Sequence, residues 1–302
     1  MILRGLVPLV FLLAAAPWGG PADGPVRPLP FYYDLYTFRG DAGATTVVAA
    51  FAVPAGTLER DWEDGQARYR FDVTLVLADT ALKAVRRTDD SVVVAVPRSL
   101  SRDHILYTHI EVQAPPSATT LQRVIMTDAS APGIGQLYGS AFPIPDYTGT
   151  ELMLSDVALG DPGVGEGWRR GDVTLALLPT SQFPEGSFDV YYEVYNLPAG
   201  HRYVTEIAVE PVDETGVPRG GGGMVRARFD GTASAAPDGA LGELRRVNTS
   251  LARGSYRLTV TVTDQETGAA AARSRPFQVR GGSRRATMVP ALPRGPHSVR
   301  PG

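Results

Sequence analysis

The sequence of 302 residues predicts an all-β protein: two tandem immunoglobulin-like antiparallel β-sandwich domains, followed by a disordered basic C-terminal tail. Short segments of alternating apolar and polar residues recur along the chain with turn residues between them, a pattern typical of sandwiches. The most regular stretch, residues 187–211, predicts a long β-hairpin in which Pro198 and Gly200 supply the turn. The length of the chain also favours two domains.

The N-terminus predicts a secretory signal peptide over residues 1–22. Arg4 supplies one positive charge, residues 5–16 are apolar, and small residues offer cleavage after Ala16 or after Ala22. The apolar run is too short to span a bilayer, although an uncleaved anchor is the alternative interpretation. We therefore expect an exported protein, periplasmic or extracellular, with no integral membrane segment after cleavage.

Residues 23–30 are rich in Pro and Gly and are expected to form an extended linker. The first sandwich is predicted over residues 31–146, because β-branched and aromatic runs there are separated by turns and stopped by Pro54 and Pro97. Its expected strands are residues 31–38, 44–53, 68–78, 91–96, 105–113 and 121–126, with a further strand at 140–144.

The second sandwich is predicted over residues 150–280. Residues 187–211 form its central hairpin, and residues 255–279 form a closing hairpin around a turn that ends at Gly268. Residues 241–246 are compatible with one helical turn. The tail, residues 281–302, contains Gly, Pro and Arg but no acidic residue, and it is predicted to be a disordered basic segment.

The two predicted domains repeat one another in outline, which suggests a tandem repeat. An Arg-Gly-Asp triplet precedes a β-branched or apolar run in each, at residues 39–41 and at residues 170–172. Because Gly-Asp is common in hairpin turns, we interpret both triplets as turns and not as adhesion motifs.

Composition excludes several classes of protein. A net charge of −3 gives the chain no attraction to nucleic acid or to an anionic membrane. The absence of cysteine excludes lipid attachment through a thiol, disulfides, thiolate catalysis and Cys-based zinc sites. Lys83 is the only lysine among many arginines, as expected for a GC-rich bacterial genome.

The sequence offers no convincing catalytic, metal or cofactor site. His104 and His109 are five residues apart, so a strand would place them on opposite faces, where they cannot share an ion. Glu193 and Glu206 are a possible carboxylate pair, but exposed acids on a sheet face are far more common than catalytic ones. We therefore expect a protein that is not an enzyme and has no cofactor.

Tyrosines provide the best binding candidates. On the strand at residues 188–195, Phe188, Val190, Tyr192 and Val194 share the face expected to form the core. Tyr191, Glu193 and Tyr195 share the opposite face, an aromatic and acidic surface that suits a protein partner or a glycan. The alternative is that this face packs against the other domain. A second candidate group is Tyr32, Tyr33 and Tyr36.

Four segments together resemble the C-terminal β-sandwich region of bacterial exported proteins of the GWxTD-domain type. They are residues 152–157 (LMLSDV), 178–183 (LPTSQF), 190–197 (VYYEVYNL) and 254–260 (GSYRLTV). The likeness covers residues 152–279. The defining motif is absent, because Gly167-Trp168 is followed by Arg169, Arg170 and Gly171, with Arg-Gly in the place of Thr-Asp. The resemblance implies a sandwich in an exported protein, and no catalytic residue.

These observations predict an exported, non-enzymatic interaction or structural module of the bacterial cell envelope or extracellular space. A protein partner in the envelope is expected. The alternative is a carbohydrate-binding module that uses the face of Tyr191, Glu193 and Tyr195.

Overall fold

The computed structural model describes residues 28–131, 133–134, 138–161, 167–179, 187–219, 224–235, 239–248, 251–279 and 286–288. These residues form strands β1 to β20 and two single 3-10 turns, η1 (Asp41–Gly43) and η2 (Ala55–Thr57), with no α-helix among them. The predicted all-β class is confirmed. The predicted signal peptide, residues 1–22, lies outside the described residues. Within the described ranges, no helix is long and apolar enough to cross a membrane.

Two sheets enclose the first core. In one sheet the strand order is β1-β2-β6-β20; in the other, β4 pairs with β3, β5 and β7, and β7 pairs with β8 and β9. The bounds are β1 (Tyr32–Arg39), β2 (Thr45–Pro54), β3 (Arg60–Glu63), β4 (Gln66–Ala78), β5 (Ala84–Val96), β6 (Ile105–Ala114), β7 (Leu121–Asp128), β8 (Gly133–Ile134), β9 (Tyr138–Ala141) and β20 (Ala286–Met288). The alternating residues of β4 from Tyr69 to Leu77 are buried in this core, as their spacing predicts.

A second pair of sheets encloses the other core. In one sheet β14 pairs with β17 along one edge and with β10 and β11 along the other, and β13 and then β12 follow β11. The facing sheet has the order β16-β15-β18-β19. The bounds are β10 (Met153–Leu154), β11 (Ala158–Asp161), β12 (Trp168–Arg170), β13 (Val173–Leu177), β14 (Phe188–Tyr195), β15 (Arg202–Pro211), β16 (Val225–Thr232), β17 (Ala240–Val247), β18 (Gly254–Asp264) and β19 (Ala270–Val279). This arrangement is compatible with the predicted pair of immunoglobulin-like sandwiches.

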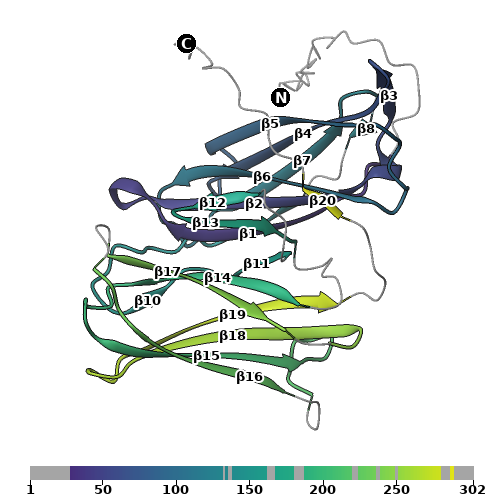
Figure 1. Ribbon diagram of the computed structural model, residues 1–302. Helices are drawn as coiled ribbons and strands as arrows, with labels where there is room; N and C mark the ends of the chain where they lie inside the picture. Colours follow the sequence, from purple (N-terminus) through teal and green to yellow (C-terminus); the bar gives the residue numbers. More distant parts are fainter. Residues whose placement is uncertain are drawn as a thin grey trace, which may run out of the picture.

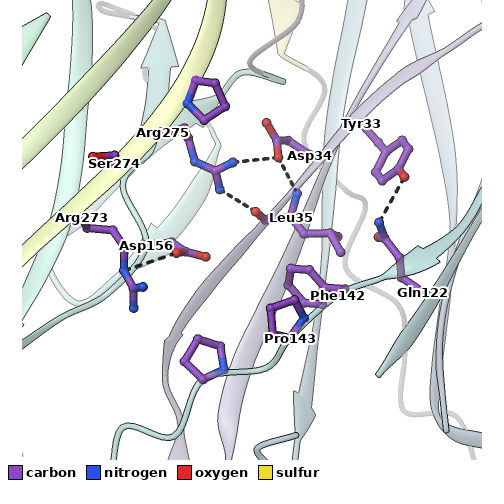
Figure 2. A pocket seen from close by; sticks show the side chains of 12 residues that line it. Tyr33, Asp34, Leu35, Gln122, Phe142, Pro143, Asp156, Arg273, Ser274 and Arg275 are labelled. Atoms are coloured by element: carbon purple, nitrogen blue, oxygen red, sulfur yellow. Dashed lines mark hydrogen bonds and ion pairs between the residues drawn. The ribbon is translucent and has the colours of Figure 1, made fainter. Parts of the chain in front are cut away.

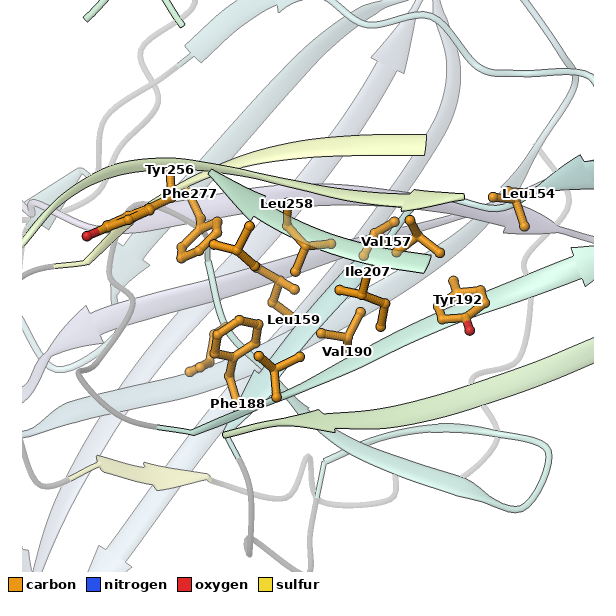
Figure 3. Packing of buried hydrophobic residues seen from close by; sticks show 14 of the residues in the cluster. Leu154, Val157, Leu159, Phe188, Val190, Tyr192, Ile207, Tyr256, Leu258 and Phe277 are labelled. Carbon is orange, nitrogen blue, oxygen red and sulfur yellow. The ribbon is translucent and has the colours of Figure 1, made fainter. Parts of the chain in front are cut away.

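The core face of β14 is confirmed. Phe188, Val190, Tyr192 and Val194 all lie in the second hydrophobic core, beside residues of the facing strands β15, β18 and β19 (Figure 3). Phe188 contacts Phe277 with ring centroids 5.7 Å apart. Aromatic contacts of this kind add to the free energy gained by burial alone.

The predicted hairpin over residues 187–211 is wrong, because β14 and β15 lie in different sheets. After β14 the chain crosses the sandwich through a turn with Asn196 at φ +62° and Gly200 at φ +85°. Both faces of β14 carry large residues, so this strand is stable in the middle of a sheet that is covered on both sides. Alternation identifies each strand, but it does not tell whether two strands pair or face one another.

Two further predictions are corrected. Residues 241–246 belong to strand β17, which pairs with β14 along its whole length, and not to a helical turn. In the tail predicted to be disordered, residues 281–302, three residues form β20 and pair in parallel with β6 of the first sandwich. The other residues of that tail lie outside the described residues.

The two sandwiches pack against each other, so that the four sheets stack as layers (Figure 1). A third hydrophobic cluster lies between the β1-β2-β6 sheet and the sheet that contains β13 and β14. Phe38 stacks on Trp168 with centroids 4.8 Å apart, and Trp168 meets Tyr191 edge-on at 5.5 Å. Because this cluster is apolar and aromatic, its burial joins the two pairs of sheets into one packed body.

Candidate functional site

The three residues of the predicted binding face are buried. Tyr191, Glu193 and Tyr195 have exposed fractions of 2%, 4% and 0%, because their face of β14 packs against the first sandwich. The expectation that they form an exposed surface for a protein partner or a glycan is therefore wrong. The structure instead matches the alternative, in which this face packs against the other domain.

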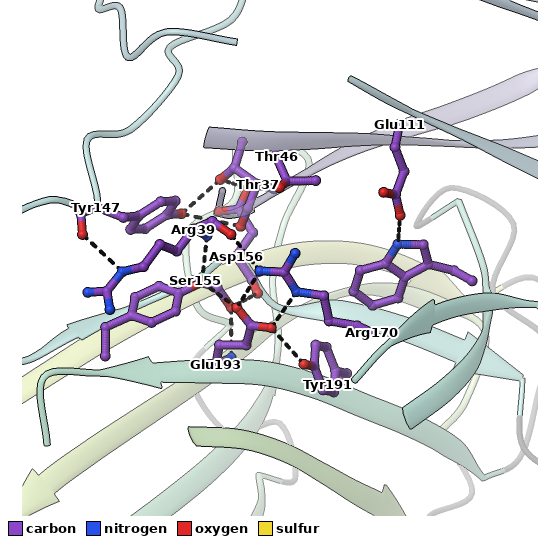
Figure 4. A network of polar contacts seen from close by, with 12 residues as sticks. Thr37, Arg39, Thr46, Glu111, Tyr147, Ser155, Asp156, Arg170, Tyr191 and Glu193 are labelled. Carbon is purple, nitrogen blue, oxygen red and sulfur yellow. Dashed lines mark hydrogen bonds and ion pairs between the residues drawn. The ribbon is translucent and has the colours of Figure 1, made fainter. Parts of the chain in front are cut away.

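Glu193 lies at the centre of a buried polar network (Figure 4). Its carboxylate accepts hydrogen bonds from Tyr191 Oη at 2.8 Å and Tyr195 Oη at 2.6 Å. Arg170, at the end of β12, donates to both carboxylate oxygens, from Nε at 2.7 Å and Nη2 at 3.1 Å. Such a bidentate, charge-assisted pair is the arrangement that allows a carboxylate to be buried.

The titration behaviour of this network follows from burial and charge. Burial, and then the negative charge of Glu193, raise the pKa of Tyr191 and of Tyr195 well above the ordinary value. Burial lowers the pKa of Arg170, but the hydrogen bonds and charge of Glu193 outweigh it and hold that pKa above its usual range. These phenols stay protonated and donate hydrogen bonds, so they act as structural groups and not as acids or nucleophiles.

The network continues into the first sandwich. The backbone N–H of Arg39 donates to Tyr195 Oη at 2.7 Å, and the Arg39 guanidinium lies 4.2 Å from the centroid of the Tyr195 ring. Thr37 donates to Asp156 from its backbone N at 2.9 Å and from Oγ1 at 2.7 Å. The first residue of each Arg-Gly-Asp triplet, Arg39 or Arg170, thus ends a strand before a hairpin turn at this interface, and the turn interpretation of both triplets is confirmed.

The other candidates from the sequence do not form a site. Burial lowers the pKa of His109 on β6, so this ring favours the neutral form. The two carboxylates considered as a pair lie in different sheets: Glu193 is in the interface, whereas Glu206 is on the outer face of β15, where its side chain is 62% exposed. No group of three or more potential metal ligands occurs in the part of the chain that the structure describes.

A cleft of about 500 Å³ opens where the two sandwiches meet (Figure 2). It is lined by residues that come from β1, β7, the segment after β9, the segment after β10 and β19. Tyr33 of the second candidate tyrosine group lines it, whereas Tyr36 is fully buried and donates from Oη to the backbone oxygen of Leu178 at 2.7 Å. The cleft could not be predicted from the sequence, because its walls come from segments that are far apart in the chain. The tyrosines near residue 33 were the only local indication of a site there.

Two ion pairs stand in the cleft. Arg275 donates from Nη1 to Asp34 Oδ1 at 2.8 Å and from Nη2 to the backbone oxygen of Leu35 at 2.6 Å. Arg273 Nε lies 3.7 Å from Asp156 Oδ1. Arg275 also lies over the ring of Tyr36, 4.2 Å from its centroid. The cleft therefore combines fixed charges with an aromatic and proline-rich wall.

The surface offers one prominent aromatic residue. Trp62, on β3, is 56% exposed and is the only aromatic side chain among the large exposed hydrophobics of the described residues. The Arg60 guanidinium lies 5.6 Å from the centroid of its ring. Trp and Arg are the residues most often found at the centres of protein interfaces.

Comparisons with known proteins assign no function. No family model matches the chain, and no curated protein matches it. A red sea bream transglutaminase structure shares 10% identity with a TM-score of 0.24, over 82% of this chain and 31% of that one. A Bacteroides uniformis β-glucuronidase shares 13% identity with a TM-score of 0.26, over 77% of this chain and 26% of that one. The chain spans less than a third of these structures, and at these scores the likeness carries no argument about activity.

Proposed function

We propose that this protein is an exported, non-enzymatic interaction or structural module of the bacterial cell envelope or extracellular space, and that it works through a protein partner. The signal-like N-terminus and the resemblance to exported proteins of the GWxTD-domain type support the export of the chain.

The observation that carries the proposal is the polar network between the sandwiches. Its most reactive groups, the carboxylate of Glu193 and the phenols of Tyr191 and Tyr195, are bonded to one another and to Arg170. Tyr195 and Arg170 also bond to the backbone of Arg39 on β1, so the network links two sheets instead of facing a substrate. A two-domain body with a packed and ion-paired joint presents its outer surfaces at a fixed spacing, which suits a module that holds or positions a partner.

The hairpin of β3 and β4 is the surface that we expect the protein partner to contact. Trp62 supplies a large exposed ring, and Arg60 beside it is held by a hydrogen bond to Ser99 Oγ at 2.6 Å. A preorganised Trp and Arg pair loses little conformational freedom on binding, which favours affinity.

The experiment is cross-linking in intact cells. The tagged full chain is produced in its native bacterium, the cells are fractionated, and cross-linked partners are identified for the unmodified chain and for Trp62→Ala. We expect the chain in the periplasmic or extracellular fraction, with a specific partner that Trp62→Ala loses. A chain retained in the cytoplasm, or a partner list that is unchanged by Trp62→Ala, contradicts the proposal.

A further inference from the structure

The cleft between the sandwiches has the properties of a small-molecule site. Its volume of about 500 Å³ lies within the range of roughly 300–1,000 Å³ that is typical of ligand pockets. Asp34 of β1 and Arg275 of β19, which form one of its ion pairs, are 241 residues apart in the chain. A site built at a domain junction in this way exists only when both sandwiches are folded and joined.

The charges in the cleft cancel. Each arginine has its own carboxylate, Asp34 for Arg275 and Asp156 for Arg273, so the four side chains carry no net charge. Asp156 is held further by two hydrogen bonds from Thr37. An anionic ligand would have to displace a fixed carboxylate from its arginine. A cationic ligand would have to displace an arginine from its carboxylate. The cleft is therefore suited to a neutral ligand.

Two polar atoms of the cleft wall lack partners. Gln122 on β7 is only 8% exposed, and its Oε1 accepts no hydrogen bond, while its Nε2 donates to Ser140 Oγ at 2.7 Å and to Tyr33 Oη at 3.2 Å. Arg273 Nε also lacks a hydrogen bond, since 3.7 Å from Asp156 is too long for one. Buried polar groups without partners are rare and costly, so a bound ligand that pairs with them gains affinity.

One acceptor and one donor without partners favour a ligand rich in hydroxyl groups. A hydroxyl both donates and accepts, so two separate hydroxyls of one extended ligand can satisfy Gln122 Oε1 and Arg273 Nε, which lie at opposite sides of the cleft (Figure 2). Planar amide and guanidinium groups are well suited to such hydroxyl pairs because their polar atoms lie in fixed directions.

Much of the remaining wall is apolar. Tyr33, Phe142 and Pro143 line the cleft and are held by the structure around it: Tyr33 and Phe142 pack against the first core. A pyranose ring has an apolar face of C–H groups, which packs on aromatic and proline surfaces while its hydroxyls reach the polar groups.

We propose that the cleft between the two sandwiches binds a neutral oligosaccharide, with Gln122 and Arg273 pairing with its hydroxyls and with Tyr33, Phe142 and Pro143 packing against its ring face. This inference deepens the proposed function by naming a ligand for the module. The oligosaccharide proposal depends on the proposed function in one respect, which is that the protein binds its ligand without catalysing a reaction.

The test measures binding of neutral oligosaccharides of glucose, mannose and N-acetylglucosamine to the purified full chain, by calorimetry and by saturation-transfer NMR. An acidic oligogalacturonide and a proline-rich peptide are measured in parallel. Two variants of similar size alter the cleft: Gln122→Met removes the amide, and Arg273→Lys keeps the charge but removes Nε. Arg202→Met, which alters an exposed surface pair outside the cleft, is the control, and thermal unfolding shows that each variant is folded.

We expect at least one neutral oligosaccharide to bind, with affinity about tenfold weaker in each cleft variant, the effect of losing about 1.4 kcal/mol of hydrogen bonding. Arg202→Met should bind as tightly as the unmodified chain. The proposal is overturned if no neutral oligosaccharide binds to the folded chain, if the cleft variants bind with unchanged affinity, or if only the acidic sugar or the peptide binds. Such a failure leaves the cross-linking result at Trp62 untouched, so the two proposals fail separately.

Discussion

Removal of the Arg170 guanidinium tests whether the buried network holds the molecule together. In Arg170→Met, Glu193 keeps its two phenol donors but loses the only cation that contacts its carboxylate among the described contacts. The Glu193 side chain, 4% exposed in the unmodified protein, is then buried without a cation beside it. Loss of one partner from a buried ion pair typically costs about 3–5 kcal/mol, a large share of the roughly 5–15 kcal/mol that stabilises a protein.

The assay is urea unfolding, followed by the fluorescence of Trp168 in a background in which the other two tryptophans, Trp18 and Trp62, are replaced by Phe. Trp168 lies in the interface against Phe38 and Tyr191, so its emission reports directly on the joint between the sandwiches. The matched control is Arg202→Met, which removes an arginine from a surface pair with Glu266 in which the arginine side chain is 74% exposed. Surface pairs of this kind contribute about 0–1 kcal/mol.

A double-mutant cycle separates the ion pair from other effects of Arg170→Met. Glu193→Leu alone leaves Arg170 and two phenols without their acceptor, but the double variant leaves no buried charge in the network. We expect the double variant to be less destabilised than the sum of the single variants, by about 1–3 kcal/mol. The reasoning is refuted if Arg170→Met costs no more than Arg202→Met, or if the two single effects simply add.

Three further predictions concern single positions. Tyr191→Ala should lower the free energy of unfolding by about 3–5 kcal/mol, as for other buried aromatics, so chemical denaturation should show a large loss of stability, and a stable Tyr191→Ala would contradict its place in the interface. Burial raises the pKa of Asp264, but hydrogen bonds from His201, Thr267 and the Glu266 N–H outweigh it and lower that pKa to about 2. The unfolded chain therefore binds a proton at a higher pH than the folded chain does, so stability from Asp264 is present above about pH 4 and lost as the pH falls towards 2. Between about pH 4 and pH 2, the free energy of unfolding should fall less for Asp264→Asn than for the unmodified protein. An equal fall in the two proteins would contradict the lowered pKa of Asp264. Gly231→Ala places a Cβ in steric conflict with the ring of Tyr203, so we expect a loss of about 1–3 kcal/mol in thermal unfolding. Gly254→Ala, where the nearest atom is 3.7 Å away, is a milder comparison.

Strand positions could be predicted well because each depends on local alternation. The core face of β14 and the turn that closes β18 onto β19 follow from residues within a few positions of one another. The pairing of strands depends on distant residues, which explains the error at residues 187–211. Alternation also gave no warning of β20, because a strand of three residues is too short to show a period.

The candidate face could be identified, but its surroundings could not. The sequence places Tyr191, Glu193 and Tyr195 together on one side of a strand, and the structure confirms that grouping. What covers them comes from β1 and β12, and no local spacing links Glu193 to Arg170 or Tyr195 to Arg39. Strong aromatic character on both faces of residues 188–195 was the available signal, since a strand exposed on one side rarely carries so many large rings.

The stacking of the two sandwiches also limits how the protein can be synthesised and divided. The joint buries Tyr36, Phe38 and Val48 against Trp168 and Tyr191. Either half produced alone would therefore expose a broad apolar surface to solvent. The N-terminal half emerges first from the ribosome. Its apolar surface is therefore exposed, and prone to aggregation, until the second half has been synthesised and has folded against it. Expression of either half alone therefore favours aggregation, whereas the two halves expressed together can associate through the apolar surfaces of the joint.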